Sequence, residues 1–192
     1  MQKLLLGLLC SGVFTVAALA ALEAGDSAPH FEARASLAGK AFDFSLRDAL
    51  DDGVVVVYFY PSAYTRGCNI QAHEFAVNMD KFTAAGASVI GVSLDSIERL
   101  NDFSADPEYC AGKLAVASDK SGDIARSYGL AVREASEGKK DTRGVDITHG
   151  RAERTTFIVT SDGVIAETIG GVKAMENVQK SLAAVEQLAD RS

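Results

Sequence analysis

The sequence has little of what several common functions require. It has 19 Lys and Arg against 26 Asp and Glu, which gives a formal net charge of −7 at pH 7. Nucleic acids and anionic membrane surfaces are bound mainly through Lys and Arg, so neither is an expected partner. The three histidines (His30, His73 and His149) are scattered, and no His or Cys spacing suits a zinc site. We therefore expect no metal and no other cofactor.

Internal repeats and a second domain are also lacking, and 192 residues of this composition fit one globular domain. The apolar run 4–19 follows Lys3 and ends in the small-residue pattern Ala18-Leu19-Ala20. This arrangement predicts a secretory signal over 1–20, followed by an exported, periplasmic domain over 21–192. The run is short for a membrane span, which needs about 20 apolar residues. Acylation at Cys10 is an alternative, although the leucine before it is too large.

Cysteine is scarce, with three residues in the whole chain. Cleavage of the signal removes Cys10 and leaves Cys68 and Cys110. In an oxidising compartment two thiols form either a static disulfide or a redox-active pair, and the count alone leaves both readings open.

The remaining chain alternates between strand and helix patterns. Apolar, β-branched runs at 54–60 and 88–94 predict strands covered on both faces, and the polar stretch 133–151 predicts a surface excursion. Alternation of this kind indicates an α/β fold around a mixed sheet. The other expected elements are an N-terminal hairpin with an edge strand at 41–46, a helix with Ile70, Phe75, Val77 and Phe82 on its apolar side, a helix between the cap Ser96 and Pro107, a strand at 114–117, a short helix at 121–128, a hairpin of 155–159 with 164–169, and a helix at 175–188.

Cys68 lies where the strand 54–60 gives way to a helix. The helix dipole and the unpaired N–H groups of a first turn favour negative charge there, and the thiolate is the reactive form of cysteine. Fast nucleophilic attack by a thiolate also needs donors that stabilise the charge developing on the leaving group. The sequence around Cys68 is therefore the first place to look for such donors.

The run Pro61-Ser62-Ala63-Tyr64-Thr65-Arg66-Gly67-Cys68 resembles the peroxiredoxin signature, in which Thr follows Pro by four residues and Cys follows Thr by three. The segments 25–31, 118–129 and 154–157 resemble other parts of the same family. The chain is most similar to the PrxQ, or bacterioferritin-comigratory-protein, subgroup. The resemblance implies a thioredoxin-like fold in its peroxiredoxin variant, with a central mixed sheet, flanking helices and an N-terminal hairpin.

The resemblance also implies roles for individual residues. Cys68 attacks a hydroperoxide, Thr65 binds the thiolate and the peroxide, Arg154 stabilises the developing negative charge, and Pro61 shields the thiolate from water. Cys110, expected near the following helix, resolves the sulfenic acid as an intramolecular disulfide after local unwinding. A hydroperoxide is the expected substrate, a thioredoxin-like or glutaredoxin-like protein the expected reductant, and a monomer the expected state.

Three positions depart from the subgroup's pattern. His73 stands where a resolving cysteine is common, Gln71 where a carboxylate is common, and Arg66 where a proline is common. Two other functions remain as alternatives. A thiol–disulfide oxidoreductase needs Cys-x-x-Cys, but Thr65 occupies the first of those positions. A non-enzymatic exported protein with a static Cys68–Cys110 disulfide is the other.

Overall fold

The apolar runs of the sequence form the interior of a seven-stranded sheet. We describe the fold from a computed structural model, which describes residues 20–191. Strand β3 (Val54–Phe59) pairs in parallel with β4 (Ala87–Ser93), and β4 pairs in parallel with β5 (Ala115–Ser118). The predicted strand at 54–60 is therefore an interior strand, next to the middle strand β4. Because most residues of both strands are buried, neither shows a polar alternation.

Antiparallel strands complete the sheet on both sides. The N-terminal hairpin of β1 (Glu32–Leu37) and β2 (Lys40–Ser45) adds to β5, and the hairpin of β8 (Thr155–Val159) and β9 (Ile165–Gly170) adds to β3. The resulting order is β2-β1-β5-β4-β3-β8-β9, with β2 at one edge as the sequence predicts. The sheet is mixed, as expected.

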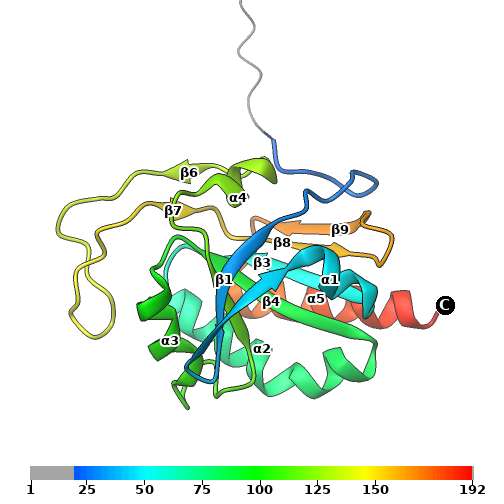
Figure 1. Ribbon diagram of the computed structural model, residues 1–192, viewed down its shortest axis with the longest axis horizontal. Helices are drawn as coiled ribbons and strands as arrows, with labels where there is room; N and C mark the ends of the chain where they lie inside the picture. The colour runs from blue at the N-terminus through cyan, green and yellow to red at the C-terminus, as the bar shows by residue number, and fades with distance from the viewer. Residues whose placement is uncertain (1–19, 192) are drawn as a thin grey trace, which may run out of the picture.

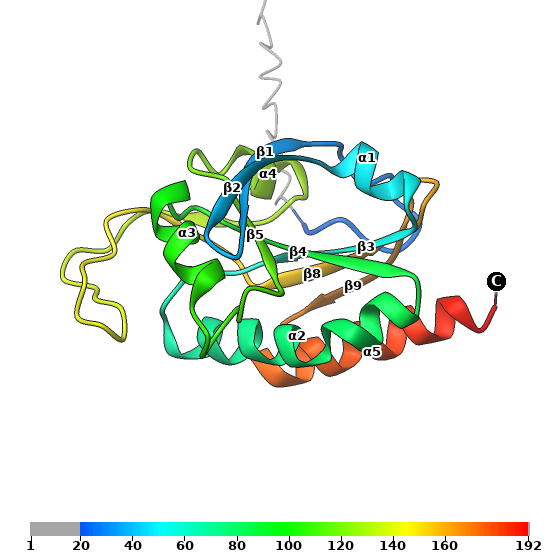
Figure 2. The same ribbon diagram turned by 60° about the horizontal axis from the view of Figure 1, so that its bottom comes forward.

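Helices cover both faces of this sheet. Figure 2 shows α2 (Arg66–Ala84) and α5 (Ala174–Ala189) side by side beneath it, with α1 (Leu46–Asp51) and α4 (Asp123–Ser127) on the opposite side. Helix α3 (Ile97–Ala105) packs near the β1 end. Buried apolar side chains form two clusters, one on each face of the sheet. Cys68 and Cys110 both belong to the cluster between the sheet and the helices α2 and α5.

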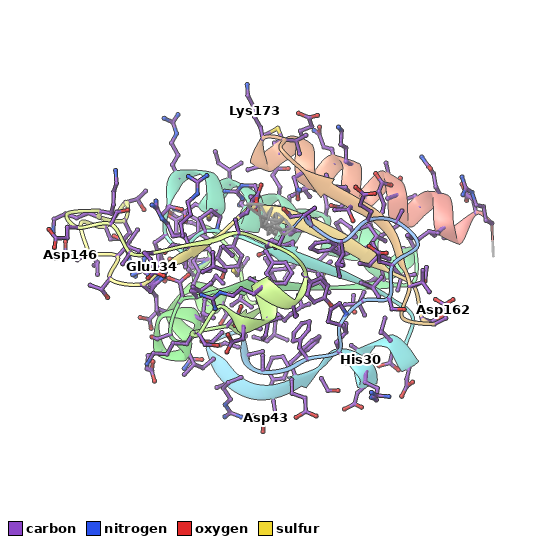
Figure 3. All side chains as sticks on the ribbon, turned by 90° about the horizontal axis from the view of Figure 1, so that it is seen from above. His30, Asp43, Glu134, Asp146, Asp162 and Lys173 are labelled. Atoms are coloured by element: carbon purple, nitrogen blue, oxygen red, sulfur yellow. The ribbon has the colours of Figure 1, made fainter. Side chains whose placement is uncertain are left out.

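The polar stretch 133–151 leaves the body of the protein, as expected. Figure 1 shows it as a long excursion to one side, and Figure 3 places Asp146 at its outer end and Glu134 nearer the sheet. Its two ends pair as the short strands β6 (Val132–Arg133) and β7 (Arg151–Ala152), which the sequence did not predict. The excursion is therefore closed at its base by a two-stranded ladder.

One further expectation was wrong, and one helix was missed. Ile70 and Val77 are not on the buried side of α2, because their exposed fractions are 41% and 56%. The buried side instead carries Phe75, Phe82 and small or polar residues, which mislead a search for apolar periodicity. Helix α1 was not predicted, although the hydroxyl of Ser45 caps it by accepting from the N–H of Asp48.

The expected signal lies outside the described residues except for Ala20, so cleavage there stays a prediction. Within residues 20–191, no helix has both the length and the apolarity that a membrane crossing requires.

Candidate active site

Cys68 occupies the first turn of α2, directly after the loop that leaves β3. Thr65 has the extended backbone of a helix N-cap, and its carbonyl accepts the N–H of Asn69 at 2.8 Å. By their position in the first turn, the N–H groups of Gly67 and Cys68 have no acceptor within the helix. These donors and the helix dipole favour negative charge at the start of the helix. Only 2% of Cys68 is exposed.

Arg154 also contacts Cys68, although the two residues are far apart in the sequence. It precedes β8, in which Thr155 pairs with Phe59, so Arg154 lies where β3 ends and the Cys68 loop begins. Its Nη2 is 3.4 Å from the sulfur of Cys68. A Cβ added to Gly67 would lie 3.2 Å from the same Nη2, so glycine leaves room for the guanidinium. The geometry brings a fixed positive charge to the sulfur.

Buried polar side chains hold that guanidinium in place. Nη1 of Arg154 donates to Oε1 of Gln71. Nε2 of Gln71 donates to Oδ1 of Asn177 at 2.8 Å, and the same oxygen accepts from the hydroxyl of Thr156 at 2.7 Å. Gln71, Thr156 and Asn177 are all fully buried, and Nδ2 of Asn177 donates to the carbonyl of Ile169. Gln71 was visible in the sequence as a departure, whereas nothing local marked Asn177.

Thr65 and Pro61 belong to the loop that leads from β3 to Cys68. The hydroxyl of Thr65 donates to the carbonyl of Ser62 at 2.8 Å, so it closes the loop and does not bond the sulfur of Cys68 in this structure. A lone pair of this hydroxyl remains able to accept a hydrogen bond from the O–H of a peroxide. Pro61 and Arg154 line the same pocket at the surface. Of the predicted residues, Arg154 contacts Cys68 and shares a pocket with Pro61, and Thr65 is the N-cap of the helix that carries Cys68.

The loop between Pro61 and Cys68 contains a strained residue. Tyr64 has a φ of 60°, which is rare for a bulky side chain and costs on the order of 1–3 kcal/mol. Its carbonyl accepts both the N–H and the hydroxyl of Thr142, at 2.9 and 2.8 Å. The guanidinium of Arg143 lies 3.2 Å from the centroid of its ring. Residues of the 133–151 excursion therefore hold the loop in this conformation.

The buried carboxylate of Asp95 also holds this loop, by accepting hydrogen bonds from Ser62 and Ala63. Asp95 follows β4, is completely buried, and lies at the centre of a hydrogen-bond network that the sequence did not reveal. A charged residue directly behind a buried strand was its only signal. Its carboxylate accepts from the hydroxyls of Ser62 and Ser93, the N–H of Ala63, Nε of Arg99 and Nε2 of His149.

Protonation of His149 and Asp95 follows from this network. Burial alone would lower the pKa of His149, but the hydrogen bond and charge of Asp95 outweigh it and raise that pKa above its ordinary value. Burial alone would raise the pKa of Asp95, but His149, Ala63 and Ser93 hold it below its usual range. Nδ1 of His149 lies 2.7 Å from the carbonyl of Gly150. Both ring nitrogens face acceptors, as in a charged imidazolium.

Cys110 lies in the turn after α3 and not in a helix, with the predicted break at Pro107 preceding it. It is completely buried, and both cysteines are free thiols. Burial first, and the nearby carboxylate of Asp106 second, raise the pKa of Cys110 well above its usual value. In the folded state Cys110 is therefore a neutral and weak nucleophile.

The region of Cys110 touches α2 near Cys68. Nδ1 of His73, five residues after Cys68, lies 3.0 Å from the carbonyl of Glu108, two residues before Cys110. Tyr58 lies in the same layer of the core, and its hydroxyl is buried without a hydrogen-bond partner among the described residues. Burial is the main cause that raises the pKa of Tyr58.

Within residues 20–191, no group of three or more His, Cys, Asp or Glu side chains is arranged to hold a metal ion. The chemistry of the site rests on a thiol at a helix N-terminus, a guanidinium at the sulfur, and a threonine hydroxyl beside them. Such a set suits nucleophilic attack by sulfur with stabilisation of a leaving oxygen.

Comparisons with known proteins agree with this geometry. The AhpC/TSA family model matches residues 24–168. The chain is 31% identical over 152 residues to peroxiredoxin Bcp of Escherichia coli, covering 79% of this chain and 88% of that protein. It is 30% identical over 161 residues to a putative peroxiredoxin bcp of Helicobacter pylori, covering 84% of this chain and 96% of the relative.

Solved structures show the same fold. Peroxidoxin BcpB from Mycobacterium tuberculosis superposes with a TM-score of 0.72 at 25% identity, covering 87% of this chain and 98% of that one. The bacterioferritin comigratory protein of Xanthomonas campestris superposes with a TM-score of 0.64 at 27% identity, covering 81% and 91%. The predicted thioredoxin-like fold in its peroxiredoxin variant is confirmed. The chain therefore belongs to the AhpC/TSA family and is a thiol peroxidase of the Bcp, or PrxQ, type.

Proposed function

We propose that Cys68 is the thiol that reduces the peroxide and that Cys110 resolves its oxidised form. The thiolate of Cys68 attacks the terminal oxygen of a hydroperoxide, and the O–O bond breaks. The sulfur is oxidised to a sulfenic acid, and the leaving oxygen takes a proton to become water or an alcohol. The contact between Nη2 of Arg154 and the Cys68 sulfur, at 3.4 Å, is the observation that carries this assignment.

Arg154 and Thr65 have complementary parts in this step. Arg154 stabilises the thiolate before reaction and the negative charge that moves onto the peroxide oxygen during it. Thr65 presents its hydroxyl beside the first turn, while its bond to the carbonyl of Ser62 fixes its position. The N–H groups of Gly67 and Cys68 supply further donors by their place in the helix. Pro61 covers the approach from water.

Resolution completes the first half of the cycle. Cys110, as a thiolate, attacks the sulfur of the sulfenic acid. The S–O bond breaks, the hydroxide that leaves takes a proton from solvent to become water, and a Cys68–Cys110 disulfide remains. The contact of His73 with the carbonyl of Glu108 supports this pairing, because it joins the α2 region after Cys68 to the turn that holds Cys110.

Burial of both thiols requires a conformational step in this scheme. A folded Cys110 is neutral, and a thiol must become a thiolate to attack. We infer that the first turn of α2 and the turn 106–112 both open, which exposes Cys110 to water and lowers the cost of its ionisation. Ala111 has a φ of 52°, so opening also releases backbone strain beside Cys110.

The remaining parts of the cycle follow the same chemistry. A dithiol protein of thioredoxin-like or glutaredoxin-like type would return two electrons and restore both thiols. Hydrogen peroxide and organic hydroperoxides are the proposed substrates; the X. campestris relative is described as having alkyl peroxide reduction activity. Export to the periplasm, with the domain over 21–192 acting as a monomer, remains part of the proposal on the strength of residues 1–20.

The resolving role can be tested by adding one equivalent of hydrogen peroxide to the reduced protein and recording intact mass and free thiols. Loss of two hydrogens and both thiols, with a linked peptide containing Cys68 and Cys110, is the expected result. Cys110→Ser should instead gain one oxygen at Cys68. A wild-type protein that gains oxygen without losing the Cys110 thiol would rule out Cys110 as resolver. An unchanged mass would exclude peroxide reduction as well as the disulfide.

A further inference from the structure

A pocket opens beside the active site on the surface. Its volume is about 210 Å³, and Pro61 and Arg154 are among its lining residues. Its other lining residues come from the base of the excursion, namely Arg133, Arg151, Ala152 and Glu153. The pocket thus joins the guanidinium that contacts the sulfur of Cys68 to a wall made by β6 and β7. A substrate larger than hydrogen peroxide would place its tail there.

The wall of this pocket contains an unfavourable arrangement of charge. Arg133 and Arg151 are direct cross-strand partners, in a ladder of only two residue pairs. Like charges directly opposite each other destabilise a ladder. Acidic residues are abundant in the chain, with 26 Asp and Glu, so there is no shortage of partners. A like-charged pair at the mouth of an active site therefore calls for a functional reason.

No carboxylate neutralises these arginines. Within residues 20–191, Arg133, Arg151 and Arg154 form no ion pair, whereas Arg34 and Arg99 both do. Nη2 of Arg151 donates to the hydroxyl of Ser136 at 3.1 Å, which orients it without cancelling its charge. Glu153 also lines the pocket, so three guanidiniums and one carboxylate leave a net charge of +2 there.

Arg154 is already committed to Gln71 and Cys68. Arg133 and the remaining N–H groups of Arg151 are therefore the donors open to a ligand. Guanidinium groups bind carboxylates through paired, charge-assisted hydrogen bonds. We propose that Arg133 and Arg151 bind the carboxylate of an anionic organic hydroperoxide and direct its peroxide group to Cys68. This inference rests on the proposed function, because the oxidation at Cys68 is the step already described.

The proposal separates substrates by charge and not by size. Hydrogen peroxide does not extend to the outer wall, so its reduction should not depend on Arg133 or Arg151. A neutral organic hydroperoxide should be indifferent to them as well. A carboxylated hydroperoxide of equal size should react faster, and this preference should shrink as salt is added, because exposed charges are screened. Glu153→Gln should strengthen the preference by removing the one opposing charge.

The test uses the domain over residues 21–192, with dithiothreitol as reductant and two probes of matched size. These are cumene hydroperoxide carrying a para carboxylate, and its methyl ester. The double variant R133Q/R151Q should lower kcat/KM for the acid by roughly threefold to tenfold, the effect of losing two exposed ion pairs, while the ester and hydrogen peroxide keep their rates. R34Q/R47Q removes the same charge away from the pocket and should change none of the three rates.

Equal wild-type rates for acid and ester would overturn the proposal, and so would an R133Q/R151Q variant that keeps the acid preference. Unchanged hydrogen peroxide turnover shows that the double variant is folded and active. Failure of the wild type to consume any of the three peroxides would instead overturn the proposed function, and the pocket's role with it.

Discussion

The guanidinium of Arg154 lies 3.4 Å from the sulfur of Cys68, although 86 residues separate the two in the chain. The antiparallel pairing of β3 with β8 produces this contact, because Thr155 is registered with Phe59 at the end of β3. The sheet therefore places a permanent positive charge beside the sulfur of Cys68. In the proposed mechanism, activation of Cys68 depends on this tertiary contact as well as on the start of α2.

Removal of the Arg154 guanidinium should abolish most of the activity. Arg154→Met should lower kcat/KM for hydrogen peroxide by about 10²- to 10³-fold, as is typical for the loss of one donor that stabilises a transition-state charge. Initial rates with dithiothreitol as reductant measure this. Arg47→Met, which removes an exposed arginine on α1, is the matched control and should keep the wild-type rate. Near-normal activity of Arg154→Met would remove Arg154 from the mechanism.

The support beneath Arg154 should be needed for both stability and rate. Asn177→Leu leaves Nε2 of Gln71 and the hydroxyl of Thr156 without their buried acceptor. We expect a loss of about 2–4 kcal/mol in the free energy of unfolding. Gln71 is then free to turn away from Arg154, so kcat/KM should fall even where the variant is fully folded. Urea unfolding and peroxidase rates report the two effects.

Asn78→Leu is a suitable control for that variant, because Asn78 is half-buried on α2 and its side-chain amide donates to the carbonyl of Glu74 in its own helix. It should cost less than about 1 kcal/mol and leave the rate unchanged. Equal effects of the two substitutions on activity would argue against a positioning role for Asn177.

The Asp95–His149 pair should make stability depend on pH in a defined direction. The pKa of His149 is raised in the folded state, so its contribution is complete below the unfolded value of about 6.5 and is lost as pH rises through the folded-state pKa. The pKa of Asp95 is lowered, so its contribution is complete above about 3.9 and is lost as pH falls through the folded-state pKa. Stability from this pair should therefore be greatest between those limits.

Thermal unfolding across this pH range would test the prediction. His149→Gln should lose stability in the mildly acidic range and show a weaker decline above neutral pH than the wild type. His30→Gln, at an exposed position, should keep the wild-type profile. A profile of His149→Gln that is parallel to the wild type would show that folding does not raise the pKa of His149.

Hydrogen exchange should show whether the excursion 133–151 restrains the loop that precedes Cys68. Thr142→Val removes the 2.8 Å hydroxyl bond to the carbonyl of Tyr64 and keeps the shape of the side chain. Loss of about 1 kcal/mol should make amides at 65–69 exchange roughly fivefold faster. Thr168→Val, which loses a similar bond to the carbonyl of Leu22, is the control and should leave those amides unchanged. Unchanged exchange in both variants would mean that Thr142 does not restrain the loop.

Much of the fold could be predicted because the interior strands are continuous apolar runs in the sequence. The runs at 54–60 and 88–94 admit no polar alternation, and the Pro-Thr-Cys spacing marks the turn at Cys68. The phase of α2 could not be predicted, because its buried side near the site uses Gln71 and Asn69 while Ile70 faces solvent. Hydrogen bonds to Arg154 and Asn177, and not apolar contacts, account for the burial of Gln71.

The residues missed in the site share one physical property. Asp95 and Asn177 are buried polar groups that make sense only through partners distant in the chain. A sequence shows that a polar residue follows a buried strand or lies in an amphipathic helix, but not which donors fold against it. The pairing of Arg133 with Arg151 was hidden for the same reason, since it depends on how the two ends of the excursion return to each other.

Consumption of hydrogen peroxide by the wild type, Cys68→Ser and Cys110→Ser, with dithiothreitol as the reductant, tests the central claim most directly. The account predicts that the wild type turns over and that Cys68→Ser is inactive. Cys110→Ser should still react, because a small thiol can reduce the sulfenic acid at Cys68 once the loop opens. A Cys68→Ser variant that consumes peroxide at the wild-type rate would contradict the account.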